Sequence, residues 1–280
     1  MAARHGIRPK KSLGQHFLIE PALARRIAEL AEVGPKTHVL EVGAGLGSLT
    51  RALAEAGAFV LAVEMDRALI PALKETVEGF DRVRVVDADA LRADWSSLLD
   101  RPGPWTMAAN LPYNVAVPVV MRILEDEPRV DRLLIMVQRE VGERLAAGPG
   151  EPQFGALSLH VAYRAEARVL RKVSRTVFWP QPNVDSVLVS LIRRPPPVDV
   201  DEAALWTVID GAFEQRRKAM RSAAVRLGFG SEEAARALAD CGIDPQTRPE
   251  RLGLPEFACL ARRWLERGGA RRVRCGAPEA

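Results

Sequence analysis

Residues 110–113 combine a side-chain amide, a proline and an aromatic ring in one short segment. The Asn110 side-chain oxygen and the Leu111 carbonyl are placed to accept the two hydrogens of an exocyclic amine, which turns the nitrogen lone pair toward an electrophile. Pro112 restricts Leu111 so that this carbonyl turns inward, and Tyr113 offers a flat face to a base. The segment therefore predicts chemistry on the amino group of an adenine.

A glycine-rich turn follows an apolar segment near the start of the chain, with glycines at 43, 45 and 47. A dinucleotide-binding turn would carry glycine at position 48, where the helix meets a pyrophosphate, but Ser48 stands there. The pattern favours a ligand without pyrophosphate. Since Gly43 and Gly45 lack a Cβ atom, the main chain is free to lie along a flat ligand.

Two carboxylates follow the next two apolar segments. Glu64 lies 21 positions after Gly43, where an acidic residue accepts hydrogen bonds from ribose hydroxyls. Asp89 follows the third segment, and a carboxylate there is placed to accept from an adenine amino group; Asp87, inside the segment, is placed less well. Together with the glycines these residues predict an adenosine pocket, which suits S-adenosylmethionine better than NAD.

The elements that must position these residues alternate in type between about residues 38 and 194. Strands are expected at 38–42, 59–64, 82–86, 105–109, 132–137 and 187–192. Helices are expected at 21–32, 49–56, 67–78, 117–125 and 138–146. This rhythm predicts an α/β fold with a parallel sheet covered by helices on both faces, so that the chemistry lies at the carboxyl ends of the strands.

A domain boundary is expected at residue 195, because three successive prolines at 195–197 cannot donate to a sheet ladder. Residues 1–195 form the first domain, with 1–12 as a flexible basic tail. Residues 196–280 form a helical second domain, and its last dozen residues form a loose tail. Its helices are expected at 202–213, 217–227, 231–241 and 255–267.

Composition adds few further constraints. The chain has 40 basic and 36 acidic residues, and 34 of the basic residues are arginines; this bias is consistent with phosphate binding and equally with a GC-rich genome, so composition alone does not decide. Cys241, Cys259 and Cys275 are widely spaced, so we expect neither a disulfide nor a zinc site. Apolar runs are too short for a membrane span, and no secretory signal is present, which indicates a cytoplasmic protein.

These segments together resemble the ribosomal RNA adenine dimethyltransferases, most closely the bacterial members that act on the small subunit, over almost the whole chain. Further matching segments are residues 15–18, 41–50, 178–186 and 212–218. The resemblance implies a Rossmann-like class I methyltransferase sheet with a small all-α C-terminal domain. It also implies that His16, where the family often has Asn, the backbone of Leu18, and Asn110 contact the cofactor. Phe178 would stack on the target adenine opposite Tyr113.

The activity implied by the resemblance is the transfer of two methyl groups from S-adenosylmethionine to N6 of each of two adjacent adenosines. These lie near the 3′ end of 16S rRNA in the small ribosomal subunit, and the step belongs to late ribosome biogenesis. We expect a monomer without a metal ion. RNA phosphates are expected to bind basic residues in one helical stretch of the second domain, namely Arg216, Arg217, Lys218, Arg221 and Arg226, together with Arg144 and residues 8, 10 and 11.

Two alternatives stay open at this point. A relative that methylates large-subunit rRNA is disfavoured by the long basic C-terminal domain. A non-catalytic assembly factor that keeps only the fold and the RNA surface is disfavoured by the intact segment 110–113.

Overall fold

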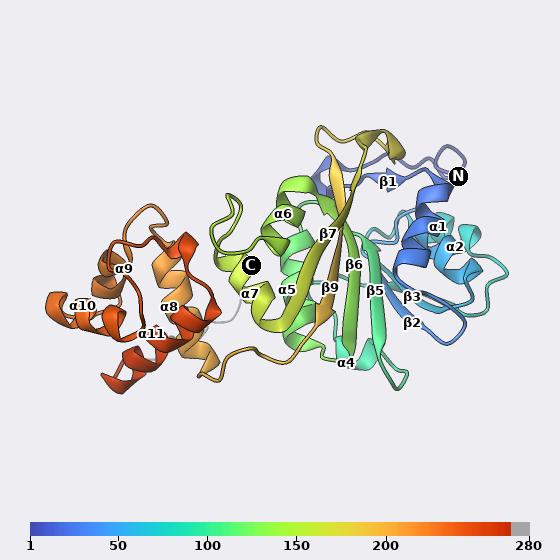
Figure 1. Cartoon of the computed structure of the whole chain (residues 1–280). Coiled ribbons are helices and arrows are strands. Elements are labelled where there is room, and N and C mark those ends of the chain that lie inside the picture. Colours follow the sequence, from blue (N-terminus) through green and yellow to red (C-terminus); the bar gives the residue numbers. More distant parts are fainter. Residues whose placement is uncertain (270–280) are drawn as a thin grey trace. The chain divides into compact units, whose positions relative to one another are not determined.

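The structure, a computed structural model, describes residues 1–269, apart from the side chain of Lys11. Its seven-stranded main sheet has the order β4-β3-β2-β5-β6-β9-β7 (Figure 1). The strands are β2 (His38–Val42), β3 (Phe59–Glu64), β4 (Val83–Asp87), β5 (Trp105–Asn110), β6 (Val130–Gln138), β7 (Ala165–Val173) and β9 (Ser186–Arg193). All six expected strands are present within two or three residues of their predicted ends.

The sheet is not wholly parallel, which corrects the expectation from the sequence. Strands β4, β3, β2, β5 and β6 pair in parallel, whereas β9 pairs antiparallel with both β6 and β7. The edge strand β7 was missed because most of its side chains are exposed, and charged and apolar residues are mixed among them, so it shows no alternation of apolar and polar residues. The fold class, α/β with a Rossmann-like sheet, is as predicted.

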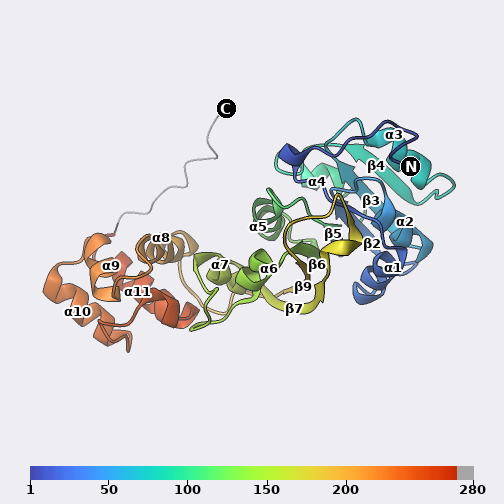
Figure 2. The same cartoon turned by 90° about the horizontal axis from the view of Figure 1, so that it is seen from above.

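Helices cover both faces of the main sheet (Figure 2). Buried leucines and alanines of α1 (Pro21–Leu30) and α2 (Ser48–Glu55) pack with Leu134, Met136 and Leu188 on one face. On the other face, α6 (Arg139–Ala146) approaches β9 so closely that its Gly142 lies directly over Val187. The remaining helices of this unit are α3 (Ile70–Thr76), α4 (Trp95–Leu98) and α5 (Ala116–Asp126), with short 3-10 turns at Lys11–Leu13 and Arg175–Val177.

A second, two-stranded sheet joins the N-terminal segment to a distant part of the chain. Strands β1 (Phe17–Leu18) and β8 (Phe178–Trp179) pair antiparallel, with Phe17 opposite Trp179 and Leu18 opposite Phe178. The segment before β1, expected as a flexible tail, contacts the rest of the unit, since Lys10 Nζ donates to Asp66 Oδ1 at 2.8 Å. The N-terminal segment is therefore bound to the chain just beyond the end of β3.

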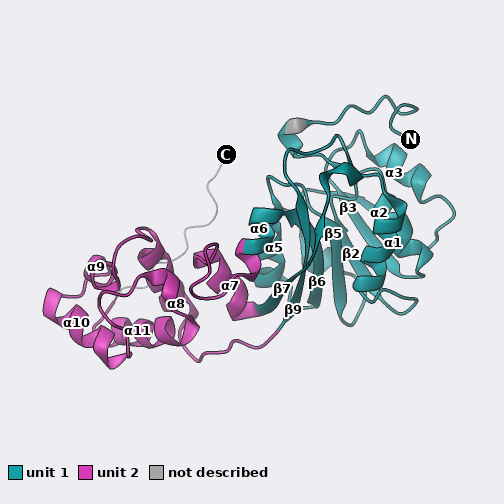
Figure 3. Cartoon of the chain, turned by 45° about the horizontal axis from the view of Figure 1, so that its top comes forward, with its two compact units in different colours: residues 1–143, 165–193 teal, residues 144–164, 194–280 magenta. Residues whose placement is uncertain are grey.

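The chain divides into two compact units (Figure 3), which are residues 1–143 with 165–193, and 144–164 with the chain from 194 onward. The second unit contains α7 (Ala156–Arg164), α8 (Glu202–Phe213), α9 (Met220–Arg226), α10 (Ser231–Asp240) and α11 (Leu254–Glu266), with a 3-10 turn at Pro249–Arg251. Unlike the expected boundary at 195, this division assigns 144–164 to the helical unit. The reason is that Phe154, Leu159 and Tyr163 are buried in the same core as α8 and α11.

Two further expectations for the helical unit are corrected. Cys241 and Cys259 form a disulfide, although none was expected, because the end of α10 and the middle of α11 bring their Cα atoms to 5.6 Å. The predicted helix at 217–227 begins only at Met220, since Ala219 has extended backbone angles. The expected C-terminal tail lies, from residue 270, outside the described residues, as does Cys275.

No helix within residues 1–269 is long and apolar enough to cross a membrane. The same part of the chain holds no group of three or more His, Cys, Asp or Glu side chains arranged to bind a metal ion.

The contact between α6 and β9 yields a stability prediction. A Cβ atom on Gly142 would lie 2.2 Å from Val187 Cγ2 and 2.9 Å from Val189 Cγ2. We expect Gly142→Ala to destabilise the protein by about 1–3 kcal/mol, because overpacking outweighs the better helix propensity of alanine. Thermal unfolding by calorimetry measures the loss. Gly148→Ala, where a Cβ atom meets nothing within 4 Å, serves as the control; an equally stable Gly142→Ala protein would contradict the close approach.

Candidate active site

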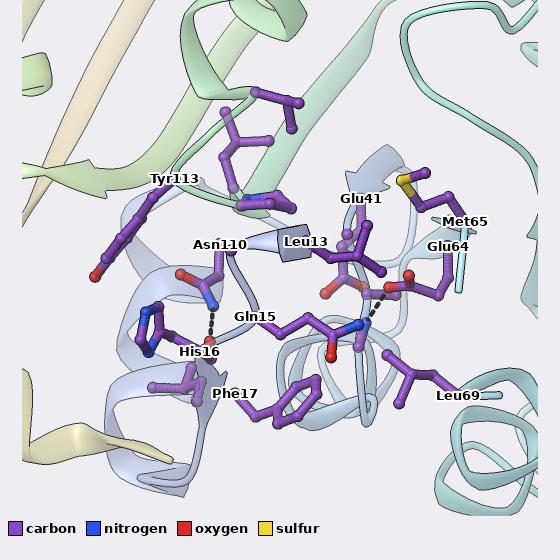
Figure 4. A pocket seen from close by; sticks show the side chains of 18 of the residues that line it. Leu13, Gln15, His16, Phe17, Glu41, Glu64, Met65, Leu69, Asn110 and Tyr113 are labelled. Atoms are coloured by element: carbon purple, nitrogen blue, oxygen red, sulfur yellow. Dashed lines mark hydrogen bonds between the residues drawn. The ribbon is translucent and has the colours of Figure 1, made fainter. Parts of the chain in front are cut away.

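One cavity lies at the carboxyl ends of β2, β3 and β5, entirely within the first unit (Figure 4). Its wall is built from the glycine loop, the ends of β3 and β5, and the N-terminal segment around β1. Figure 4 shows Tyr113, His16 and Asn110 on one side of it, and Glu64, Met65 and Leu69 on the other. The predicted residues that line it are His16, Leu18, Gly43, Gly45, Glu64, Asp89, Asn110, Leu111, Pro112 and Tyr113.

The glycine loop has left-handed backbone at each of its three glycines. Two of them make room for neighbouring parts of the site. A Cβ atom on Gly43 would lie 2.9 Å from Pro112 Cδ, and one on Gly45 would lie 3.0 Å from the Phe17 ring. The loop is thus packed between the segment 110–113 and β1, which brings the two predicted motifs into contact.

Glu64, the last residue of β3, binds the backbone of the glycine loop through its carboxylate. Its Oε2 accepts from Gly45 N at 2.8 Å and its Oε1 accepts from Asp66 N at 2.9 Å. Burial raises its pKa, and the two backbone donors oppose that shift. Both oxygens already have one donor, so Glu64 shapes the loop as well as lining the cavity.

Asp66 fastens the N-terminal segment over the same edge. Its two carboxylate oxygens accept from Lys10 Nζ and from Gln15 Nε2, each at 2.8 Å. Although burial acts to raise its pKa, these donors outweigh burial and hold the pKa below the usual value. The carboxylate is therefore charged at neutral pH and holds Gln15 beside the cavity.

Glu41 is a residue of the site that the sequence analysis did not single out. It is 1% exposed, lines the cavity, and its Oε2 has no hydrogen-bond partner in the structure. Burial raises its pKa to about 8. A carboxylic acid between the apolar residues Leu40 and Val42 of β2, two positions before Gly43, was the signal in the sequence for a functional residue here.

Asp89 lines the cavity, as predicted from its place beyond the end of β4. Its Oδ1 accepts from Leu91 N at 2.9 Å, and Arg92 is 3.8 Å from its Oδ2. Asp87, the alternative, does not line the cavity and instead pairs with Arg67 at 2.7 Å. The structure thus favours Asp89 of the two.

Asn110 is the last residue of β5, and only one end of its side-chain amide has a hydrogen-bond partner. Its Nδ2 donates to the His16 carbonyl at 2.9 Å, while its Oδ1 is buried without a hydrogen-bond partner. The same His16 donates from Nδ1 to the Pro180 carbonyl, at 2.7 Å. The amide is thereby oriented with a free acceptor in the cavity wall, which is the group that the sequence analysis assigned to an amine hydrogen.

Tyr113 is held in place by Ser186, at the start of β9. The two hydroxyl groups are 2.6 Å apart, Ser186 is fully buried, and burial raises the pKa of Tyr113. The Tyr113 ring lies 5.0 Å from the His16 ring, centroid to centroid. Leu111 N donates to Met136 O at 3.1 Å, which anchors the segment to β6.

Phe178, which the resemblance places against the target adenine, is not among the residues that line the cavity. It is 3% exposed, packs in the core with Leu18 and Leu188, and is absent from the cavity wall. Phe178 pairs with the buried Leu18 across the two-stranded sheet, so stacking of a base on Phe178 stays a prediction. The neighbouring Trp179 is the exposed aromatic residue of this strand, at 39%.

The basic residues predicted for RNA binding do not share one helix. Arg216, Arg217 and Lys218 lie in the turn between α8 and α9, and Arg221 and Arg226 lie in α9. Several already have partners within their own unit. Arg216 Nε donates to Glu250 Oε2 at 2.8 Å, Arg221 to Ser231 Oγ at 2.9 Å, and Arg226 to Gly211 O at 3.0 Å.

The sequence matches one family model and several bacterial proteins that carry the same name. The family model of ribosomal RNA adenine dimethylases matches residues 6–258. "Ribosomal RNA small subunit methyltransferase A" of Thermobifida fusca is 48% identical over 267 residues, covering 93% of this chain and 92% of that protein. The protein of the same name from Moorella thermoacetica is 44% identical over 267 residues, covering 92% of this chain and 93% of its own length.

Two solved structures share the fold over most of the chain. A dimethyladenosine transferase from Plasmodium falciparum has a TM-score of 0.77 at 22% identity, covering 90% of this chain and 98% of its own. The 23S rRNA methyltransferase ErmE has a TM-score of 0.68 at 27% identity, covering 88% and 98%. The match of the family model over nearly the whole chain and the identity to the two bacterial relatives lead to one conclusion: the chain belongs to the ribosomal RNA adenine dimethylase family.

Proposed function

We propose that the protein transfers methyl groups from S-adenosylmethionine to N6 of two adjacent adenosines near the 3′ end of 16S rRNA, within the small ribosomal subunit. The observation that carries the chemistry is the buried, unpartnered Oδ1 of Asn110 beside Tyr113. Family membership and the name of the bacterial relatives support the small subunit as the substrate. The 27% identity to a 23S rRNA methyltransferase is lower, so a large-subunit substrate is disfavoured.

The cavity fits S-adenosylmethionine by the chemistry of its donors. Glu64 and Asp89 offer carboxylate oxygens to ribose hydroxyls and to the adenine amine, and in the order of the strands Glu64 lies between Asp89 and the glycine loop. Glu41 carries a buried carboxyl oxygen without a partner, which suits the cationic ammonium of the cofactor's amino acid part. When bound, the cofactor supplies an electrophilic methyl group on a sulfonium centre.

The residues of the 110–113 segment then prepare the target amine. Asn110 Oδ1 and the Leu111 carbonyl accept the two amine hydrogens, so the nitrogen lone pair turns toward the methyl carbon. The nitrogen–carbon bond forms as the carbon–sulfur bond breaks and its electron pair stays on sulfur. The methylated nitrogen is a cation of low pKa and releases its proton to water. Holding the amine and the methyl group in the right orientation lowers the barrier by up to ~7–11 kcal/mol. Because the proton leaves only after transfer, the mechanism needs no general base.

We expect exposed arginine and lysine side chains, mainly those of the helical unit, to bind the RNA phosphates. A target adenine must leave its stack at a cost of a few kcal/mol, and phosphate contacts supply the compensating affinity. Arg217 and Lys218 are exposed and are free to contact phosphate without breaking any described hydrogen bond. Arg216, Arg221 and Arg226 would first have to exchange an internal partner.

The function is tested by incubating the protein with unmethylated small ribosomal subunits and tritiated S-adenosylmethionine, followed by mapping of the modified bases. We expect four methyl groups per subunit, two on each of two adjacent adenines. Label on 23S rRNA alone would favour the large-subunit alternative. Subunit binding without any transfer would favour the non-catalytic assembly factor.

Asn110→Ala tests the polarisation of the amine. Loss of the acceptor should slow single-turnover methylation by about 100- to 1,000-fold, on the scale of ~2.7–4 kcal/mol for a preorganised polar group, while subunit binding persists. Asn114→Ala is the comparison variant: its Nδ2 also donates to the N-terminal segment, at Ser12 O, and it also lines the cavity, but its side chain is exposed, so it separates loss of the buried acceptor from loss of a bond to that segment. Equal rates for Asn110→Ala and wild type would rule out this mechanism.

Glu41 gives cofactor binding a defined pH dependence. Because its pKa in the free protein is about 8, Glu41 carries a proton at pH 6–7, and pairing with a cation expels that proton. Affinity for S-adenosylmethionine should therefore rise as the pH rises toward 8, by up to about tenfold per pH unit. Calorimetry in buffers of different ionisation enthalpy measures the proton release.

Glu41→Gln provides the comparison, since the raised pKa of Glu64 also contributes to the wild-type pH profile. The variant should bind S-adenosylmethionine with a flatter pH dependence and release fewer protons. If wild type and Glu41→Gln show the same proton release, Glu41 does not face the ammonium group.

A further inference from the structure

A second groove adjoins the cofactor cavity on the outer side of β1. It is lined by the start of α1, by α2 from Ser48 to Glu55, by Thr76, by Trp179 and Ile19, and by the first two residues of the chain. It shares Leu18, Leu46 and Ser48 with the wall of the cofactor cavity. Its volume of about 620 Å³ is within the range of roughly 300–1,000 Å³ for sites that take small organic ligands.

Trp179 presents an aromatic surface to this groove. Its ring stacks on Phe17 with 6.0 Å between centroids, and Phe17 in turn packs against Gly45 of the cofactor loop. Trp179 is 39% exposed and Ile19 is 55% exposed. An exposed tryptophan supported from behind by a buried ring is a surface on which a planar group stacks.

The groove also carries positive charge. Arg25 on α1 is exposed and makes no ion pair or hydrogen bond with any residue from 1 to 269. Arg51 lines the groove too, but it pairs with Glu55, at 2.7 Å, which offsets its charge. A ligand for the groove therefore combines a flat ring with one anionic group that Arg25 contacts.

We propose that this groove binds a nucleotide of the RNA substrate that flanks the target adenine, with its base on Trp179 and its phosphate near Arg25. The proposal rests on the proposed function and adds a contact with the substrate. Trp179 pairs with Phe17, the residue after His16, whose carbonyl accepts from Asn110 Nδ2, so the groove lies close in the chain to the residue proposed to hold the target amine. A flipped adenine requires unstacked neighbours, and unstacked bases bind aromatic side chains irrespective of their sequence.

The first test separates the role of Trp179 in RNA binding from a role in supporting β1. Trp179→Ala should raise the KM for unmethylated small subunits roughly tenfold to a hundredfold, the value of one base–aromatic stack, with S-adenosylmethionine affinity unchanged. Trp179→Phe, which keeps a ring, should restore most of the loss. A weaker cofactor affinity with an unchanged KM for subunits would overturn the proposal and make Trp179 a brace for Phe17.

The second test uses two adjacent arginines of α1. Arg25→Ala should raise the KM for subunits and reduce the salt slope of subunit binding by about one, as expected for a single lost phosphate contact. Arg26→Ala is the matched control, since Arg26 is exposed but pairs with Glu29 and does not line the groove. Equal effects of the two substitutions would mean that the groove does not hold the RNA.

A third measurement does not depend on turnover. Ultraviolet cross-linking of the full chain to a short single-stranded oligoribonucleotide with two adjacent adenines should attach label to the peptide that contains Trp179, and Trp179→Ala should abolish that label. Absence of label on that peptide in the wild-type protein would overturn the proposal that RNA binds in the groove. If subunits are not methylated but the label is present, the proposed function fails while the groove stands.

Discussion

The hydrogen bond from Asn110 Nδ2 to the His16 carbonyl, at 2.9 Å, determines how the site works. An amide has two ends, and satisfying the donor end through the N-terminal segment leaves the acceptor end buried and unpartnered. A buried polar atom without a partner costs about 1–3 kcal/mol, which the fold tolerates where a ligand will supply the missing donor. Asn110 is thus oriented before any substrate arrives, because its bond to the backbone leaves one orientation of the amide.

The N-terminal segment therefore connects all parts of the site. Asp66, just beyond the end of β3, binds this segment through Lys10 and Gln15. Strand β1 of the same segment pairs with β8, which follows the 3-10 turn at 175–177. Phe17 fills the space that Gly45 leaves open. A change in this segment alters the cofactor loop, the amide of Asn110 and the aromatic strand together.

The strands that carry the chemistry were predictable because β2, β3 and β5 are mostly apolar, and because β2 runs into the glycine turn while β3 and β5 end in Glu64 and Asn110. What the sequence could not show were pairings between distant segments. The contact of β1 with β8, the Cys241–Cys259 disulfide and the assignment of 144–164 to the helical unit all depend on tertiary packing. The same holds for Phe178, whose inward direction follows from its register opposite Leu18, and for Arg216, whose partner Glu250 is 34 positions away.

In the proposed mechanism, the free acceptor of Asn110 also explains how two transfers on one amine end. An unmethylated adenine amine has two hydrogens for the two acceptors, and after the first transfer one hydrogen remains. That hydrogen still bonds to Asn110 Oδ1, so the monomethylated base remains bound for the second transfer. After the second transfer no hydrogen remains, and the buried oxygen faces an apolar methyl group at a cost of about 1–3 kcal/mol. The group that orients the amine for attack thereby disfavours the dimethylated product, so the chemistry of the site itself promotes release.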